Sequence, residues 1–212
     1  MSPKPLIKNS LCQVGAVLVG GESKRLGKNK VLAPLGGKPL IDWVILRLAK
    51  IFPKIVLLGR KQAGLEKKAE FLEDLLPGLG PISGIYSALK ELAQPVFICA
   101  CDMPFLNEDL IRYQVEVLDD FEAVVPMPNG LFEPLHSIYT PNCLSAIERL
   151  IKKGKKRPIE FFPEISIRKI GDDELKKVDP ELLSFFNINT QEDLKKAEEW
   201  IKIHNQLKLE KI

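Results

Sequence analysis

Short apolar runs alternate along this chain with segments in which apolar residues recur at helical spacing. The apolar runs predict strands at residues 13–19, 55–58, 96–100 and 123–125. Helices are predicted between them, over residues 40–48, 82–89 and 107–118. Runs that are apolar throughout are typical of parallel strands covered on both faces. We therefore expect an α/β fold of three layers, with a mostly parallel sheet and helices on both of its faces.

The later part of the chain is less regular. Pro128-Asn129-Gly130 predicts a turn, residues 135–139 a strand that is antiparallel or at an edge, and residues 141–153 a helix. Residues 165–170 alternate between apolar and polar, as a half-exposed strand does. Thr190, with Asp193 three positions later, resembles a capping box that opens a charged terminal helix.

Length and composition favour one soluble globular domain. The 212 residues fit a single α/β domain spanning residues 1–212, with 45% hydrophobic and 28% charged residues. No segment is apolar for long enough to cross a membrane, and the first ten residues lack the apolar stretch of a secretory signal. We therefore expect a cytoplasmic protein. The net charge of +3 argues against nucleic acid as a partner and leaves small anions open.

The four cysteines do not predict a disulfide framework or a zinc site, because they are few and irregularly spaced. Cys99 and Cys101 alternate within an apolar run, which places both on one face. We expect them to be ordinary buried thiols, since free cysteine behaves as a small hydrophobic residue.

The first strand leads into a loop rich in glycine and positive charge, Leu18 to Lys30. Gly20 and Gly21 would let main-chain N–H groups approach an anion, and Arg25 and Lys30 could neutralise a polyphosphate. The spacing fits neither a P-loop nor a dinucleotide fingerprint. Such a loop can also be simply flexible and solvated, but its position at the end of a buried strand favours a binding role.

Asp102 comes directly after the strand predicted at 96–100. Ligands of such sheets bind beyond the carboxyl ends of the strands, and a carboxylate there can hold Mg²⁺ together with phosphate oxygens and water. The alternative is that Asp102 only caps a turn before Pro104. The residues around Asp102 do not by themselves distinguish the two interpretations.

Four motifs, taken in order, resemble those of molybdenum cofactor guanylyltransferases. They are the loop from Leu18 to Lys30, Gly80-Pro81-Ile82-Ser83-Gly84, Cys101-Asp102-Met103-Pro104 and Phe186-Asn187-Ile188-Asn189-Thr190. The first is shared with many sugar-phosphate and cytidylyl transferases, whereas the ordered set is more specific. The resemblance covers nearly the whole chain. Val19 departs from the alanine usual in the family, and Leu58-Gly59-Arg60 stands where an asparagine is frequent.

The resemblance implies a Rossmann-like nucleotidyltransferase fold and a magnesium-dependent reaction. GMP would pass from GTP to the terminal phosphate of molybdopterin, releasing pyrophosphate and forming the guanine dinucleotide cofactor. A nucleotide-binding half would span about 12–125 and an acceptor-binding half about 126–212. Gly20-Gly21 and the Gly80–Gly84 motif resemble those of the GTP-using members. The nucleotide would then contact Leu18, Val19, Gly20, Gly21, Arg25, Lys30, Asp74 and Asp102.

The same resemblance assigns the remaining roles. Lys30, Arg25 and Asp102 would be catalytic, with Asp102 binding Mg²⁺, while Arg157, Asn187 and Asn189 would bind the acceptor. The basic run that includes Arg157 could also be only a solvated surface. His136 could contact an acceptor, although a hydrogen-bonded structural role is the simpler interpretation.

The partners implied are GTP and molybdopterin or its molybdenum-loaded form, and other cofactor-biosynthesis proteins or molybdoenzymes could also bind. Two other functions stay open. One is nucleotidyl transfer by the same fold with CTP or to a sugar or polyol phosphate. The other is a non-catalytic nucleotide-binding adaptor.

Overall fold

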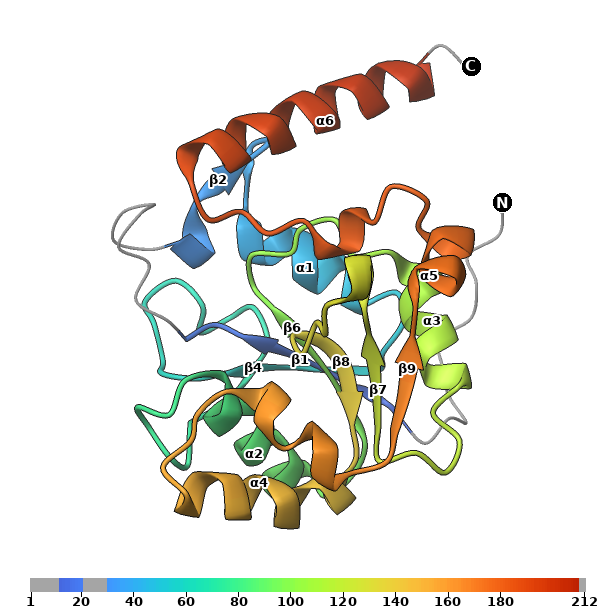
Figure 1. The fold of residues 1–212 in the computed structure, drawn as a ribbon. Coiled ribbons are helices and arrows are strands. Elements are labelled where there is room, and N and C mark those ends of the chain that lie inside the picture. Colours follow the sequence, from blue (N-terminus) through green and yellow to red (C-terminus); the bar gives the residue numbers. More distant parts are fainter. Residues whose placement is uncertain (1–11, 21–29, 210–212) are drawn as a thin grey trace.

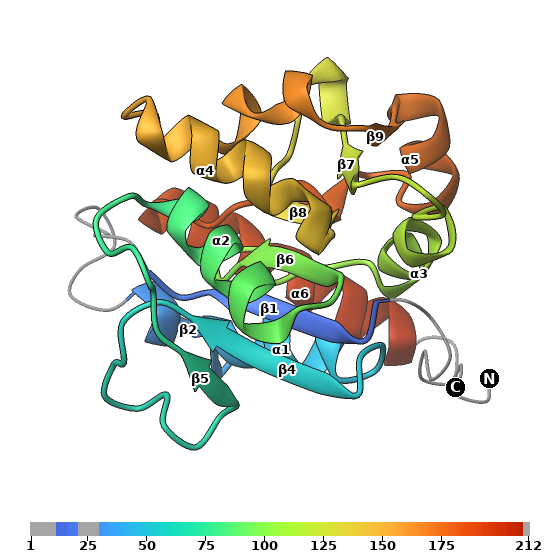
Figure 2. The ribbon, with the colours of Figure 1, turned by 90° about the horizontal axis from the view of Figure 1, so that it is seen from below.

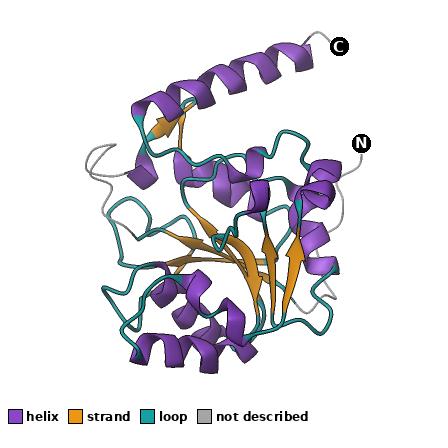
Figure 3. Cartoon of the chain, viewed as in Figure 1, coloured by secondary structure: helices purple, strands orange, loops and turns teal. Residues whose placement is uncertain are grey.

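The computed structural model describes residues 12–20 and 30–209, which form a seven-stranded central sheet (Figures 1 and 3). The strand order is β5-β4-β1-β6-β8-β7-β9. All neighbouring strands pair in parallel except β8, which is antiparallel to both β6 and β7. The strands are β1 (Val14–Leu18), β4 (Lys54–Leu58), β5 (Glu70–Leu72), β6 (Val96–Ala100), β7 (Ala123–Pro126), β8 (His136–Tyr139) and β9 (Ile167–Ile170).

Helices cover both faces of this sheet (Figures 1 and 2). One face packs against α1 (Leu40–Leu48), α3 (Glu108–Glu116) and α5 (Asp172–Val178). The other face packs against α2 (Pro81–Leu92) and α4 (Leu144–Lys152). The predicted three-layer α/β architecture with a mostly parallel sheet is therefore confirmed.

Strand β1 shows how the sequence specifies these layers. All five of its residues are buried, and side chains alternate between the faces of a strand. Ala16 and Leu18 accordingly lie in the core beneath α2, whereas Val17 lies in the core beneath α1. Gly15 leaves room for the Phe52 ring, because a Cβ at Gly15 would lie 2.7 Å from Phe52 Cδ2. An apolar run without alternation is thus what a strand between two helical layers requires.

A third, smaller core joins the terminal helix to the body. Helix α6 (Gln191–Leu209) packs near a two-stranded hairpin formed by β2 (Pro34–Leu35) and β3 (Lys38–Pro39). Figure 1 shows α6 running across the outside of this hairpin. The predicted capping box is confirmed, since Asp193 N–H donates to Thr190 Oγ1 (3.1 Å) and Thr190 N–H donates to Asp193 Oδ2 (2.8 Å).

Several elements differ from the sequence predictions. Strand β8 is antiparallel as expected, but it lies inside the sheet between β6 and β7 and not at an edge. Strand β5, the hairpin and α5 were not predicted, because each is too short to show a clear periodicity. Cys99 and Cys101 are buried in the same core, as predicted.

Short 3₁₀ helices complete the described chain. They are η1 (Lys30–Leu32), η2 (Pro128–Gly130), η3 (Pro141–Cys143), η4 (Pro158–Glu160), η5 (Phe162–Glu164) and η6 (Leu183–Phe185). Within residues 12–20 and 30–209, no helix combines the length and apolar character that a membrane crossing needs.

Candidate active site

The carboxyl end of β1 is held between the ends of its two neighbouring strands. Val19 N–H donates to O of Leu58, the last residue of β4 (2.9 Å), and the N–H of Cys101, just after β6, donates to Leu18 O (3.2 Å). Val19 as a whole is only 1% exposed and lies in the core. Its side chain therefore packs in the interior, so a valine in place of alanine need not change the surface of the site.

Two residues missed at the sequence level shape this strand end. Gly59 has a φ of +134°, and a Cβ there would lie 3.1 Å from Gly20 N, so the exit from β4 can pass Gly20 this closely only as glycine. Gln62 donates from Nε2 to Val19 O (2.5 Å). A Cβ at Gly20 itself would meet open space, which leaves this side of the main chain accessible.

The Gly80–Gly84 motif forms the beginning of α2. Gly80 has a φ of +69° and its position at the helix start carries no side-chain cap, while Pro81 occupies the first helical turn. A Cβ at Gly84 would lie 2.1 Å from Leu18 Cδ2, so this glycine allows α2 to pack directly on the end of β1. Pro81 has no N–H and Ser83 N–H donates to Gly80 O (3.0 Å), but no side chain caps this helix start, and the positive end of the helix dipole is suited to an anion.

Asp74 lies between β5 and α2, beside this helix start. Its Oδ1 is 3.8 Å from the position of a Cβ at Gly84, is shielded from solvent and has no hydrogen-bond partner among the described residues. Burial raises the pKa of the Asp74 carboxyl, and the nearby Ser83 side chain opposes that rise. A shielded, unpaired carboxylate oxygen is costly, so a donor supplied by a ligand would stabilise it.

Lys30, Asp102 and Asn189 meet at the same edge of the sheet. The Lys30 ammonium donates to Asp102 Oδ2 and to Asn189 Oδ1, the latter over 2.7 Å. The Lys30 and Asp102 side chains are only 12% and 15% exposed. Asp102 Oδ1 is shielded from solvent and unpaired among the described residues. The Asp102 carboxylate therefore pairs with the ammonium of a lysine, which is a different contact from the main-chain N–H that a turn cap would accept from.

The segment around Asn187 and Asn189 is fixed to Asp102 through the main chain, because Ile188 N–H donates to Asp102 O (3.0 Å). The Asn189 side chain points to Lys30, whereas Asn187 donates from Nδ2 to Phe185 O (3.2 Å) within its own segment. The structure thus brings the second asparagine of the motif to the Lys30 ammonium and leaves the first beside it.

The Arg157 region lies elsewhere on the surface. Arg157 is exposed and precedes η4, and its neighbour Lys156 donates from Nζ to Gly78 O (3.2 Å), in the loop before α2. The basic run therefore borders the start of α2, whereas Asn189, which was also predicted to bind the acceptor, contacts Lys30. Gly21 and Arg25, also predicted for the site, lie outside the described residues.

His136 is surrounded by aromatic rings and lacks the hydrogen bond that the sequence led us to expect. It is fully buried, its ring packs against Phe97 and Phe185, and neither ring nitrogen has a hydrogen-bond partner among the described residues. The expected hydrogen bond is therefore wrong, because the aromatic packing excludes polar partners. Burial lowers the pKa of His136 to about 4.

Glu133, which was not singled out from the sequence, is a half-buried carboxylate in the segment that leads into β8. Its Oε1 accepts from Leu135 N–H (3.0 Å). Burial raises the pKa of Glu133, the bond from Leu135 opposes this rise, and the negative charge of Asp102 adds to it.

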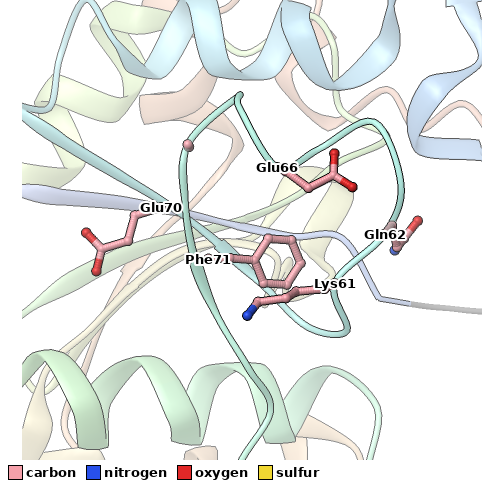
Figure 4. Close-up of a pocket in the computed structure, with 6 residues that line it drawn as sticks. Lys61, Gln62, Glu66, Glu70 and Phe71 are labelled. Atoms are coloured by element: carbon pink, nitrogen blue, oxygen red, sulfur yellow. The ribbon is translucent and has the colours of Figure 1, made fainter.

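A shallow pocket of about 340 Å³ adjoins this edge along the chain between β4 and β5. It is lined by Lys61, Gln62, Glu66, Ala69, Glu70 and Phe71, and Figure 4 shows Glu66, Gln62 and Lys61 around the Phe71 ring. Its charges are of both signs. Within the described chain, no three His, Cys, Asp or Glu side chains gather closely enough to hold a metal ion. A cation here would need ligand oxygens from a substrate in addition to protein carboxylates.

Comparisons with known proteins show which proteins this chain resembles in sequence and fold. Residues 15–164 match the model of the MobA-like NTP transferase domain. A probable molybdenum cofactor guanylyltransferase from Pelotomaculum thermopropionicum is 33% identical over 86% of this chain and 90% of its own length. The crystal structure of molybdopterin-guanine dinucleotide biosynthesis protein A from Archaeoglobus fulgidus has a TM-score of 0.79 at 33% identity, covering 89% of this chain and 98% of that one. The 2-C-methyl-D-erythritol 4-phosphate cytidylyltransferase from Thermus thermophilus shares the fold, with a TM-score of 0.65 at 16% identity over 88% and 98% of the chains.

Proposed function

The chain belongs to the family of MobA-like NTP transferases, and from this premise we propose that it transfers GMP from GTP to molybdopterin. Its relative from Pelotomaculum is named as a probable molybdenum cofactor guanylyltransferase, and the match covers most of both chains. The product would be the guanine dinucleotide form of the cofactor, together with pyrophosphate. The contact of Lys30 with Asp102 and Asn189 is the observation that carries this proposal, because it joins three predicted site residues at one place.

In the proposed reaction an oxygen of the molybdopterin terminal phosphate attacks the α-phosphorus of GTP. The new bond joins that oxygen to phosphorus, and the bond from phosphorus to the pyrophosphate oxygen breaks. No covalent enzyme intermediate is needed, because a phosphate oxygen is itself the nucleophile. The protein then contributes alignment and compensation of charge, as in other phosphoryl transfers.

Residues at the end of β1 and the start of α2 would bind the nucleotide. The accessible main chain at Gly20, with Leu18 and Val19 before it, would face GTP, and Gly21 would extend this contact. The start of α2, which has no side-chain cap, favours an anion, and Asp74 has a shielded oxygen that a nucleotide donor could satisfy. The glycine pair at 20–21 and the Gly80–Gly84 motif support guanine over cytosine by resemblance.

Lys30 would stabilise the charge that develops on the leaving pyrophosphate, and Arg25 would assist it. Lys30 is partly buried, which strengthens its interaction with phosphate relative to a fully solvated ammonium. To reach the phosphates, its ammonium would turn from Asp102 and Asn189 toward the substrate.

The residues present fit a divalent cation, which we propose to be Mg²⁺. Asp102 Oδ1 is a shielded, unpaired carboxylate oxygen, and carboxylates together with phosphate oxygens form the coordination that Mg²⁺ prefers. Asp102 would hold the ion. When bound, Mg²⁺ supplies charge compensation and orientation to the phosphates of the nucleotide.

The acceptor would lie on the side of residues 126–212. Asn189 and Asn187 flank the main-chain bond to Asp102, and Arg157 would contact the pterin substrate from the basic run. Molybdopterin or its molybdenum-loaded form fits this assignment. A cytoplasmic location and contacts with other cofactor-biosynthesis proteins or molybdoenzymes also belong to the proposal.

The direct test is incubation of the protein with GTP, Mg²⁺ and molybdopterin, followed by mass detection of the guanylated product. We expect product with GTP and little with CTP or ATP, and calorimetric titration should give the same order of affinities. Product only with CTP, or only with a sugar or polyol phosphate as acceptor, would instead support another transferase of this fold. Tight GTP binding without any product would support the adaptor function.

A further inference from the structure

The main chain of Val19, the last residue before Gly20, is held at both of its polar groups, and one of the two partners is a side chain. Val19 N–H donates to Leu58 O (2.9 Å), and Val19 O accepts from Gln62 Nε2 (2.5 Å). Gln62 comes from the segment between β4 and β5 (Figure 4), 43 positions away in the sequence. Both polar groups of Val19 are therefore engaged on the side of β4.

The turn in which Gln62 lies is itself anchored. Leu65 N–H donates to Gln62 O (3.2 Å), and the Leu65 side chain is fully buried in the core that also contains the inner face of α1. Gln62 is half-buried, so its hydrogen bond to Val19 is partly shielded from competing water. A side chain held in this way can restrain the strand end that it contacts.

Peptide geometry carries this restraint to Gly20. The peptide bond from Val19 to Gly20 is trans, so its C=O and N–H point in opposite directions. With the oxygen held by Gln62, the N–H of Gly20 points away from Gln62. Gly20 is exposed, and a Cβ there would meet no described atom within 4 Å, so side-chain packing does little to limit rotation of this peptide plane. The hydrogen bond from Gln62 does limit it.

We propose that Gln62 is a positioning residue for GTP, which orients the Val19–Gly20 peptide so that the Gly20 N–H faces the nucleotide before it binds. This inference rests on the proposed function, in which the main chain at Gly20 contacts GTP. Ordering a glycine segment in advance removes part of the entropy cost of binding. Gln62 acts through Val19 and Gly20 and needs no contact with the reacting atoms.

Two competing roles for Gln62 are a purely structural one and a direct contact with the nucleotide, since its side chain also lines the pocket beside Phe71. Gln62→Met removes the donor and keeps an unbranched, flexible side chain. Gln114→Met is the matched control, because Gln114 also donates from Nε2 to a main-chain oxygen, that of His136 (2.9 Å), within the core. Each variant loses one hydrogen bond of the same kind, and only Gln62→Met loses it at the end of β1.

The experiment compares both variants with the unmodified protein by calorimetric titration with GTP, thermal melting and NMR relaxation dispersion of the Gly20 amide in isotope-labelled protein without nucleotide. We expect Gln62→Met to weaken GTP binding by about 3- to 10-fold, the effect of losing one hydrogen bond. Exchange of the Gly20 amide on the microsecond-to-millisecond timescale should appear in this variant and disappear when GTP is added. The KM for molybdopterin should stay nearly the same. Gln114→Met should lower the melting temperature and leave GTP affinity and the Gly20 amide unchanged.

Three results would overturn the role of Gln62. Unchanged GTP affinity in Gln62→Met, or an equal loss in Gln114→Met, would leave Gln62 structural. Weaker GTP binding with an unchanged Gly20 amide would mean that Gln62 contacts the nucleotide directly.

Product formation by the unmodified protein separates this inference from the proposed function. If the unmodified protein forms product and Gln62→Met binds GTP normally, only the role of Gln62 fails. If Gln62→Met shows weaker GTP binding and an altered Gly20 amide but the unmodified protein forms no product, the role of Gln62 in nucleotide binding stands and the proposed transfer fails.

Discussion

Leu18 and Gly84 pack so closely that a Cβ on Gly84 would lie 2.1 Å from Leu18 Cδ2. This contact joins the end of β1 to the first turn of α2. It therefore brings the start of α2, which has no side-chain cap, against the strand end that leads to the exposed Gly20. The relative position of these two parts of the proposed nucleotide site depends on this close contact, together with the rest of the core that α2 and β1 share.

Gly84→Ala should consequently disturb both packing and binding. Leu18 is nearly buried, so the added methyl group forces a new rotamer or a shift of α2, at a cost of about 1–3 kcal/mol in the free energy of unfolding. GTP affinity should fall severalfold in the same variant. Gly171→Ala is the control for GTP binding, since a Cβ there meets nothing within 4 Å. Gly171 is the N-cap of α5, so this variant should lose only the modest preference of an N-cap for glycine over alanine and should keep its GTP affinity. Chemical denaturation and calorimetric titration check this, and equal behaviour of the two variants would contradict it.

The layers could be predicted well from the sequence, because a strand that is buried on both faces consists of consecutive apolar residues. Strands β1, β4 and β6 lie between two helical layers and read as apolar runs, and the capping residues of α3 and α6 stand at their expected positions. Strand β5 could not be found in this way. It has three residues and begins with an exposed glutamate, so neither length nor alternation marks it.

The site was predicted only in part for a related reason. The motifs named Lys30, Asp102 and Asn189, but their mutual contact spans 72 and 159 positions of sequence and follows from the way the chain packs. Gln62 was missed because its contact with Val19 O spans 43 positions and depends on the packing of the segment after β4 against the end of β1. The ring of His136 was expected to be hydrogen-bonded. It packs instead against Phe97 and Phe185, which are distant in the sequence, so the sequence could not predict these neighbours.

The buried imidazole of His136 predicts a specific dependence of stability on pH. Burial lowers its pKa to about 4, while the unfolded chain protonates it near 6.5. The unfolded state thus binds a proton first as the pH falls. The contribution of His136 is complete above pH 6.5 and is lost between pH 6.5 and 4, by about 3 kcal/mol in total.

His136→Phe should remove this contribution and keep the packing against Phe97 and Phe185. The stability of the variant relative to the unmodified protein should rise as the pH is lowered from 7.5 to 4.5. Denaturant titrations at several pH values measure this difference, in which the titration of other groups cancels. A difference that stays constant across the range would mean that His136 has the same pKa in the folded and unfolded states, and would contradict the effect of burial.

Arg157→Ala should weaken use of molybdopterin while leaving GTP affinity nearly unchanged, because Arg157 is exposed and assigned to the acceptor. We expect the KM for molybdopterin to rise severalfold. Lys152→Ala is the control for the general effect of removing positive charge, since Lys152 is an exposed residue at the end of α4. Steady-state kinetics with each substrate varied in turn check this. A similar change in both variants would assign the effect to net charge and not to Arg157.

Asn189→Ala tests the acceptor assignment in a residue that also contacts Lys30. If Asn189 binds the acceptor, the KM for molybdopterin should rise while the dissociation constant of GTP stays nearly the same. If its main role is to hold the Lys30 ammonium, GTP binding should change instead, because Lys30 is then positioned differently toward the phosphates. The KM for molybdopterin and the dissociation constant of GTP, measured separately, decide between these roles.

Asp102→Asn separates a metal-binding carboxylate from a structural one, since asparagine keeps the shape and an oxygen that Lys30 can donate to. If Asp102 holds Mg²⁺, turnover should fall by about 100- to 1,000-fold, because the phosphates lose orientation and charge compensation together. Affinity for GTP without metal should stay the same or improve, since a negative charge near the phosphates is gone. The fold should persist, because the remaining hydrogen bonds around Asp102, including the one from Ile188 N–H to its main-chain oxygen, do not depend on the carboxylate.

A structural Asp102 would give the opposite pattern of lower stability and nearly normal turnover. Thermal melting and GTP-dependent turnover on the same preparation distinguish the two, and substantial turnover of the Asn variant at ordinary Mg²⁺ concentrations would remove Asp102 from the catalytic site.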